Sequence, residues 1–224
     1  MNQIDPIQLL IRVPVVLLAL TVHEFCHAYF AYRMGDPTAM RLGRCSLNPI
    51  RHLDPLGTLC LMFAPIGWAK PVPINPINFT DYRKGVLVST AAGPGSNLVQ
   101  ALLFALVLRG LIFAAHRVGS SASAQTGQVF EVITVMVFLG VLVNVGLAVF
   151  NCLPLYPLDG FHITLQLMRP ESQERFAQTA HYGPFVILGI VVIENAAKVD
   201  ILGGLIKPPT LFILKHVAGV SFSS

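Results

Sequence analysis

Long apolar runs alternate with short polar segments along the chain. The runs cover about residues 7–32, 85–115, 129–150 and 183–205, and crossing a bilayer takes roughly 20 residues of apolar helix. A last apolar piece, residues 211–220, is too short to be assigned as a span on its own. The pattern predicts an all-α polytopic membrane protein, a helical bundle of about four to six spans in a single domain over residues 1–224.

The segment between the first two runs, residues 33–84, has a different character. It is rich in Pro, Gly and Asn and lacks a helical period, which predicts a small β-rich or irregular segment at the membrane surface. Its apolar part, residues 56–68, is too short to span and is expected to dip into the interface. A second polar segment, residues 161–182, is broken at Pro170.

Composition supports a bilayer as the solvent. Only 12% of the residues are charged and 54% are hydrophobic, whereas soluble domains carry about 25% charged residues. The net charge of +4 does not indicate nucleic acid, because the cations gather in one loop. By the positive-inside rule this loop is cytoplasmic and the N-terminus lies outside a cell membrane. The cations of the loop are Arg33, Arg41, Arg44, Arg51, Lys70, Arg83 and Lys84.

The four cysteines show no paired spacing, so no disulfide framework is expected. Neither is a cleavable signal peptide, because the first apolar run has no small-residue exit site and contains a functional motif.

That motif is His23-Glu24-Phe25-Cys26-His27, an HExxH sequence. Residues four apart on a helix lie on one face, about 6 Å apart along the axis. Both imidazoles can therefore bind one metal ion, with Glu24 beside them to handle protons. Ionisable groups inside an apolar span are costly, which favours a functional reading over a structural one.

A catalytic zinc site needs a third protein ligand, and the sequence offers Asp159, Glu194 and His162. The first and third spans both run from outside to inside, so Asp159 emerges near the level of His23 and His27. Glu194 falls midway along the fourth span and is expected to lie deeper. Asp159 is therefore the predicted third ligand.

Two other classes of membrane protein remain to be weighed. A metal-binding or metal-transport protein without hydrolytic activity would use the same His and Asp residues, but it would not need Glu24 between them. A di-iron desaturase or hydroxylase would need more His clusters than seven scattered histidines provide.

Three motifs in order resemble the site-2 protease family of intramembrane zinc metalloproteases, in particular its compact prokaryotic members without PDZ or CBS domains. They are HEFCH (23–27), GPGSN (93–97) and NCLPLYPLDG (151–160), and the resemblance spans about residues 15–165. Two positions depart from the family's common pattern. Cys26 stands where small residues are frequent, and His162 follows the Asp-Gly pair.

The resemblance implies one zinc ion held by His23, His27 and Asp159, with Glu24 as the base. It also implies that Asn151 and Asn97 orient the substrate or stabilise the oxyanion, although Asn151 at a helix end is equally suited to capping that helix. The implied substrate is a single-span membrane protein, such as an anti-sigma factor or a signal-peptide remnant, cleaved in or near its transmembrane segment.

Overall fold

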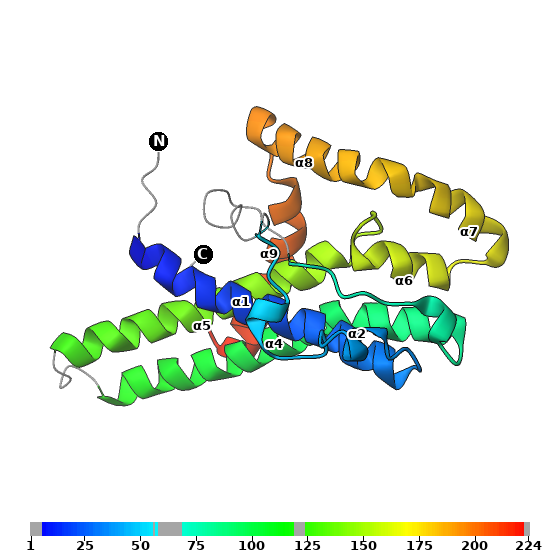
Figure 1. Ribbon diagram of the computed structural model, residues 1–224. Helices are drawn as coiled ribbons and strands as arrows, with labels where there is room; N and C mark the ends of the chain where they lie inside the picture. The colour runs from blue at the N-terminus through cyan, green and yellow to red at the C-terminus, as the bar shows by residue number, and fades with distance from the viewer. Residues whose placement is uncertain (1–5, 56, 58–68, 119–123, 222–224) are drawn as a thin grey trace.

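The computed structural model describes residues 6–55, 57, 69–118 and 124–221 (Figure 1). Within these ranges the chain folds into helices joined by turns. The long helices are α1 (Pro6–Arg33), α4 (Tyr82–Val118), α5 (Ala124–Asn151), α8 (Gly183–Ala197) and α9 (Ile201–Ile213). The short ones are α2 (Thr38–Arg41), η1 (Pro49–Arg51), η2 (Pro76–Asn78), α6 (Asp159–Leu167), α7 (Pro170–Ala177), η4 (Gln178–Tyr182) and the π-helical turn η5 (Leu214–Ala218).

Helices α1, α4 and α5 pack against one another and form the body of the molecule, with α9 and η5 against α4 and α5 (Figure 1). Small side chains on α4 make the close approach possible, since Ala101 and Ala105 are fully buried against α5. Small residues at helix interfaces are typical of bundles in membranes, where association depends on close packing. The buried side chains of this core are Ala101, Ala105, Leu108, Val137, Val141, Val145, Ile213, Leu214 and Ala218.

Five helical segments among the described residues are long and apolar enough to cross a membrane. They are Leu9–Arg33, Tyr82–Arg117, Gln125–Asn151, Pro170–Ala197 and Ile201–Ala218. The protein is thus a multi-pass membrane protein, and the predicted all-α polytopic bundle is confirmed. Helix α8 runs apart from the bundle (Figure 1), and only 6% of its span is buried within the protein.

The predicted fourth span, residues 183–205, is divided in the structure. Helix α8 ends at Ala197, Lys198 adopts a left-handed conformation with φ 52°, and α9 begins at Ile201. Asp200 and Lys207 form an ion pair beside this break. The fifth span then includes most of the apolar piece 211–220, which the sequence left unassigned. A hydropathy average over a window of many residues does not resolve so short a polar interruption.

The segment after α1 is irregular, and no strand occurs in its described part. A single bridge joins Leu53 to Ala69. Proline explains the missing ladder, because Pro71, Pro73 and Pro76 have no N–H to donate to a neighbouring strand. The apolar piece at 56–68, expected to dip into the interface, lies outside the described residues except for Gly57.

A buried carboxylate fixes the course of this segment. Asp36 is fully buried directly after α1, and its oxygens accept hydrogen bonds from the Asn75 backbone N–H at 2.7 Å and the Asn78 amide at 2.7 Å. Burial alone raises the pKa of Asp36, but hydrogen bonds from Asn78, Thr38 and Asn75 lower it below the ordinary value. The ionised side chain therefore anchors residues 69–76, called the strap below, to the end of α1.

Candidate metal centre

The HExxH motif lies on α1, and its two histidines point to one place. The Nε2 atoms of His23 and His27 are 2.9 Å apart. Asp159, the first residue of α6, brings its Oδ2 atom to 3.2 Å from His23 Nε2 and 3.3 Å from His27 Nε2. The structure thus brings together the three side chains that the sequence proposed as ligands, although Asp159 is 132 positions beyond His27 in the chain. They form a group of potential metal ligands among the described residues.

The opposite nitrogen of each imidazole determines what its Nε2 offers. His27 Nδ1 lies 2.7 Å from the backbone carbonyl oxygen of Ser89 on α4. A carbonyl only accepts hydrogen bonds, so Nδ1 carries a proton, and in the neutral form of the ring the lone pair is on Nε2. His23 Nδ1 lies 2.5 Å from Asn97 Oδ1, also an acceptor. Both rings therefore present Nε2 lone pairs to the same point.

The arrangement of the three atoms fits a zinc ion. Asp159 Oδ2 is buried and has no hydrogen-bond partner among the described residues. Two nitrogen lone pairs and a carboxylate oxygen facing one another repel unless a cation lies between them. Zinc ligands at about 2.0–2.1 Å in tetrahedral geometry are about 3.3 Å from one another, which is close to the 2.9–3.3 Å observed. Two histidines and one carboxylate leave the fourth position open, as catalytic zinc requires.

Burial and charge act in opposite directions on Asp159. Burial raises the pKa of its carboxyl group, but ion pairing with His23 and His27, when protons rather than a cation lie between the three groups, lowers it well below the ordinary value. The carboxylate is therefore ionised at neutral pH and available as a ligand. His162, one turn further along α6, has its pKa lowered by burial, so its ring is neutral under the same conditions.

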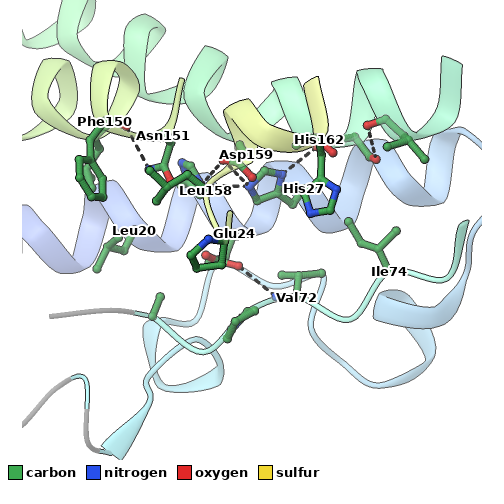
Figure 2. A pocket seen from close by; sticks show the side chains of 18 of the residues that line it. Leu20, Glu24, His27, Val72, Ile74, Phe150, Asn151, Leu158, Asp159 and His162 are labelled. Carbon is green, nitrogen blue, oxygen red and sulfur yellow. Dashed lines mark hydrogen bonds and ion pairs between the residues drawn. The ribbon is translucent and has the colours of Figure 1, made fainter. Parts of the chain in front are cut away.

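Glu24 stands beside the three ligands without joining them. It lies in a cavity of about 600 Å³ whose walls come from α1, α4, the end of α5, the start of α6 and the strap (Figure 2). Its Oε2 accepts a hydrogen bond from the Val72 backbone N–H at 3.2 Å. The cavity wall also contains apolar side chains, among them Leu20, Val72, Ile74, Leu147 and Phe150. A carboxylate in this position can take up and return a proton next to a metal-activated water.

The remaining candidates lie in different places. Asn151 lines the cavity, and its Nδ2 donates to the Leu147 carbonyl at 3.0 Å. Asn97 is fully buried behind His23 and does not line the cavity. Glu194 accepts the Leu202 backbone N–H, so it caps α9. His162 enters the cavity from α6, beside His27 (Figure 2).

Sequence reasoning missed three groups that support the site. Two are backbone groups, the Ser89 carbonyl and the Val72 N–H, which no residue type reveals. The third is Asn144 in the middle of α5, fully buried and bonded to Asn97 at 2.9 Å. A signal for Asn144 existed, since an amide within an apolar span is costly unless it has a partner.

Gly93 allows α4 to approach the histidines, and we expect Gly93→Ala to disrupt zinc binding. A Cβ atom at Gly93 would lie 2.5 Å from His27 Cε1 and 2.7 Å from His23 Cε1. Neither ring can turn away without losing its Nδ1 hydrogen bond. We expect at least about a tenfold loss of zinc affinity, comparable to the loss of a supporting hydrogen bond to a ligand.

Gly95→Ala is the matched control, because a Cβ atom at Gly95 meets nothing within 4 Å. This variant should bind zinc as the wild type does, and alanine favours the helix. Zinc affinity is measured by competition with a chelator on both purified proteins. Equal affinities for the two variants would show that α4 is not constrained at Gly93.

Comparisons with known proteins agree with this site. A sequence model of peptidase family M50 matches residues 81–191. YwhC of Bacillus subtilis, named "Putative zinc metalloprotease YwhC", is 40% identical over 180 residues, which cover 79% of this chain and 78% of YwhC. The Rip2 proteins of Mycolicibacterium smegmatis and Mycobacterium tuberculosis, described in the same words, are 31% and 32% identical over 80% and 77% of this chain. The alignments cover 65% and 62% of those two relatives. No solved structure gives a significant match.

Proposed function

The chain belongs to peptidase family M50, the site-2 proteases, and on that basis we propose how its residues perform intramembrane proteolysis. It is an intramembrane zinc metalloprotease, and proteases of this family act on membrane protein substrates within the bilayer. The proposal concerns the residues of the site, the side of the membrane and the class of substrate. We take residues 1–224 to act as one protease domain.

We assign His23, His27 and Asp159 as the zinc ligands and Glu24 as the base. The convergence of two Nε2 lone pairs and the unpartnered Asp159 oxygen beside Glu24 supports this assignment. Zinc, when bound, supplies Lewis-acid activation of water and of the substrate carbonyl. Glu24 accepts one proton of the attacking water and later donates it to the leaving nitrogen, which departs as an amine.

Asn151 is placed to assist at the substrate carbonyl. Its Nδ2 carries two hydrogens, and the bond to the Leu147 carbonyl uses one of them. The other hydrogen is available to the oxygen on which negative charge develops. The same bond to Leu147 holds the Asn151 side chain against its own helix, at the wall of the cavity.

The strap is proposed to hold the unwound substrate. Its residues 70–75 pass the cavity without regular secondary structure, with Val72 bonded to Glu24 and Asn75 bonded to Asp36. A substrate helix hides its peptide groups, so a few residues must unwind before attack, and they can then pair with an exposed backbone edge. Because Pro71 and Pro73 have no N–H, such pairing would depend mainly on the strap's carbonyl groups.

We propose that the site opens to the cytoplasmic side of a cell membrane and cleaves single-span membrane proteins, such as an anti-sigma factor or a signal-peptide remnant. The clustered cations of residues 33–84 support the orientation. The test of orientation uses cysteines at two exposed positions, Glu171 and Gln125, in a cysteine-free protein in spheroplasts. An impermeant thiol reagent should label the Gln125→Cys variant alone. Labelling of Glu171→Cys alone would reverse the orientation.

The test of the substrate class uses a photo-crosslinking amino acid at Ile74, in the cavity wall, in Glu24→Gln protein. The control carries it at Phe113, which is 60% exposed on α4. Mass spectrometry should identify single-span membrane proteins from the Ile74 position and not from Phe113. Recovery of the same partners from both positions would contradict the proposal.

A further inference from the structure

A chain of buried hydrogen bonds runs from α5 through α4 to the first histidine of the metal centre. Asn144 Nδ2 donates to the Gly140 carbonyl at 2.9 Å, and Asn144 Oδ1 accepts from Asn97 Nδ2 at 2.9 Å. Asn97 Oδ1 in turn lies 2.5 Å from His23 Nδ1. Both asparagines are 0% exposed. We refer to Asn97 and Asn144 as the amide pair.

The direction of every bond in this chain is fixed by backbone carbonyls. The Gly140 carbonyl only accepts, so Asn144 must turn its Nδ2 to it and its Oδ1 to Asn97. The Ala19 carbonyl, 3.3 Å from Asn97 Nδ2, imposes the same orientation on Asn97. Asn97 therefore presents an oxygen to His23, and the ring must carry its proton on Nδ1.

The two histidines differ in how they are held. His27 is oriented by the Ser89 backbone carbonyl, which every residue type would supply at that position. His23 is oriented by the side chain of Asn97, which is itself held by the side chain of Asn144. Partners of this kind fix the tautomer and the orientation of metal-binding imidazoles.

We propose that Asn97, held in place by Asn144, is a positioning residue that keeps His23 in the tautomer whose Nε2 lone pair faces the metal. This inference rests on the proposed function, since it takes His23 to be a zinc ligand. It gives the amide pair a role beyond joining helices, which is the common role of buried amides in membrane bundles. If the amide pair positions His23, its loss should weaken zinc binding, whereas a pair that only joins helices should leave zinc binding unchanged.

The first experiment compares zinc affinity in Asn97→Leu, Asn97→Asp and wild-type protein, using the full chain in detergent and a competing chelator. Leucine has a similar size but no acceptor, and zinc affinity should fall about 10–100-fold. Aspartate keeps an acceptor oxygen for His23, but it cannot donate to Asn144 Oδ1 or to the Ala19 carbonyl. Asn97→Asp should therefore weaken zinc binding only about threefold to tenfold, as for one lost hydrogen bond in the support, and less than Asn97→Leu.

Thr210→Val is the control for loss of a buried polar group. Thr210 is 5% exposed and donates only to the Ile206 carbonyl of its own helix, so zinc affinity should not change. Each protein is also loaded with Co²⁺, whose visible absorption reports the geometry of the ligands. The spectrum should change in Asn97→Leu and remain that of the wild type in Asn97→Asp and Thr210→Val.

The second experiment asks whether Asn144 acts through Asn97. Asn144→Leu alone should weaken zinc binding about threefold to tenfold, as expected for one lost hydrogen bond in the support. In the Asn97→Leu background the same substitution should have no further effect, because the link to His23 is already broken. Should Asn97→Leu not fold, the comparison of Asn144→Leu with Thr210→Val carries the test.

Wild-type zinc affinity in Asn97→Leu would overturn the inference, and so would equal losses in Asn97→Leu and Asn97→Asp. If the losses of zinc affinity in Asn97→Leu and Asn144→Leu add in the double variant, Asn144 does not act through Asn97, and that part of the inference is wrong. These results are distinct from failure of the proposed function. If His23→Ala binds zinc as tightly as the wild type, the ligand assignment itself is wrong, whatever the amide pair does.

Discussion

Replacement of Glu24 by glutamine is expected to abolish detectable peptide hydrolysis while zinc remains bound. Glutamine has the size of glutamate, and its side-chain oxygen can still accept the Val72 N–H that now bonds to Glu24 Oε2. It cannot accept a proton from water, and loss of a general base costs roughly 10²–10⁴-fold in rate. Cleavage of a reconstituted single-span substrate and the zinc content of the same sample give the two measurements.

Glu194→Gln is the control for this experiment. It makes the same chemical change in another spanning helix, at a residue that caps α9 rather than lining the cavity. Its cleavage rate should match that of the wild type. Full proteolysis by the Glu24→Gln protein would refute the assignment of the base, and loss of zinc from it would place Glu24 among the ligands.

Replacement of Asp159 by alanine is expected to remove zinc from the protein at concentrations that saturate the wild type. The substitution deletes one of three converging ligand atoms and the only negative charge among them. The loss of affinity should exceed the 10–100-fold that a lost supporting partner of a ligand costs. Zinc content is measured by elemental analysis after dialysis against a weak chelator.

The fold of the Asp159→Ala protein should survive, because the core between α4 and α5 is apolar and separate from the site. Circular dichroism should therefore show unchanged helix content. Asp200→Ala, which removes an exposed carboxylate paired with Lys207, serves as the control and should keep its zinc. Equal zinc content in wild type and Asp159→Ala would move the third ligand elsewhere.

The sequence predicted the bundle and the meeting of His23, His27 and Asp159, because each rests on a local rule or a simple topological one. The spacing of His23 and His27 places both on one helix face whatever the rest of the chain does. The place of Asp159 followed from counting membrane crossings. The count up to that residue needed only three long spans, so the later division at Lys198 did not disturb it.

The other features depend on contacts between segments that are far apart in the chain. The sequence suggested strands between the first two spans, but no residue pattern there showed that Asp36 would bind the strap instead. For Asn97, the resemblance indicated a polar role near the substrate, whereas the structure brings the side chain to His23. Which face of α4 an amide occupies is decided by packing against α1 and α5.

The two attachments of the strap have a mechanical consequence. Val72 is tied to Glu24 within α1, and Asn75 is tied to Asp36 directly after the same helix. A tilt of α1 would carry the strap with it, so Glu24 would keep its position relative to this wall of the cavity. A widening of the cavity between α1 and the strap would require these hydrogen bonds to break.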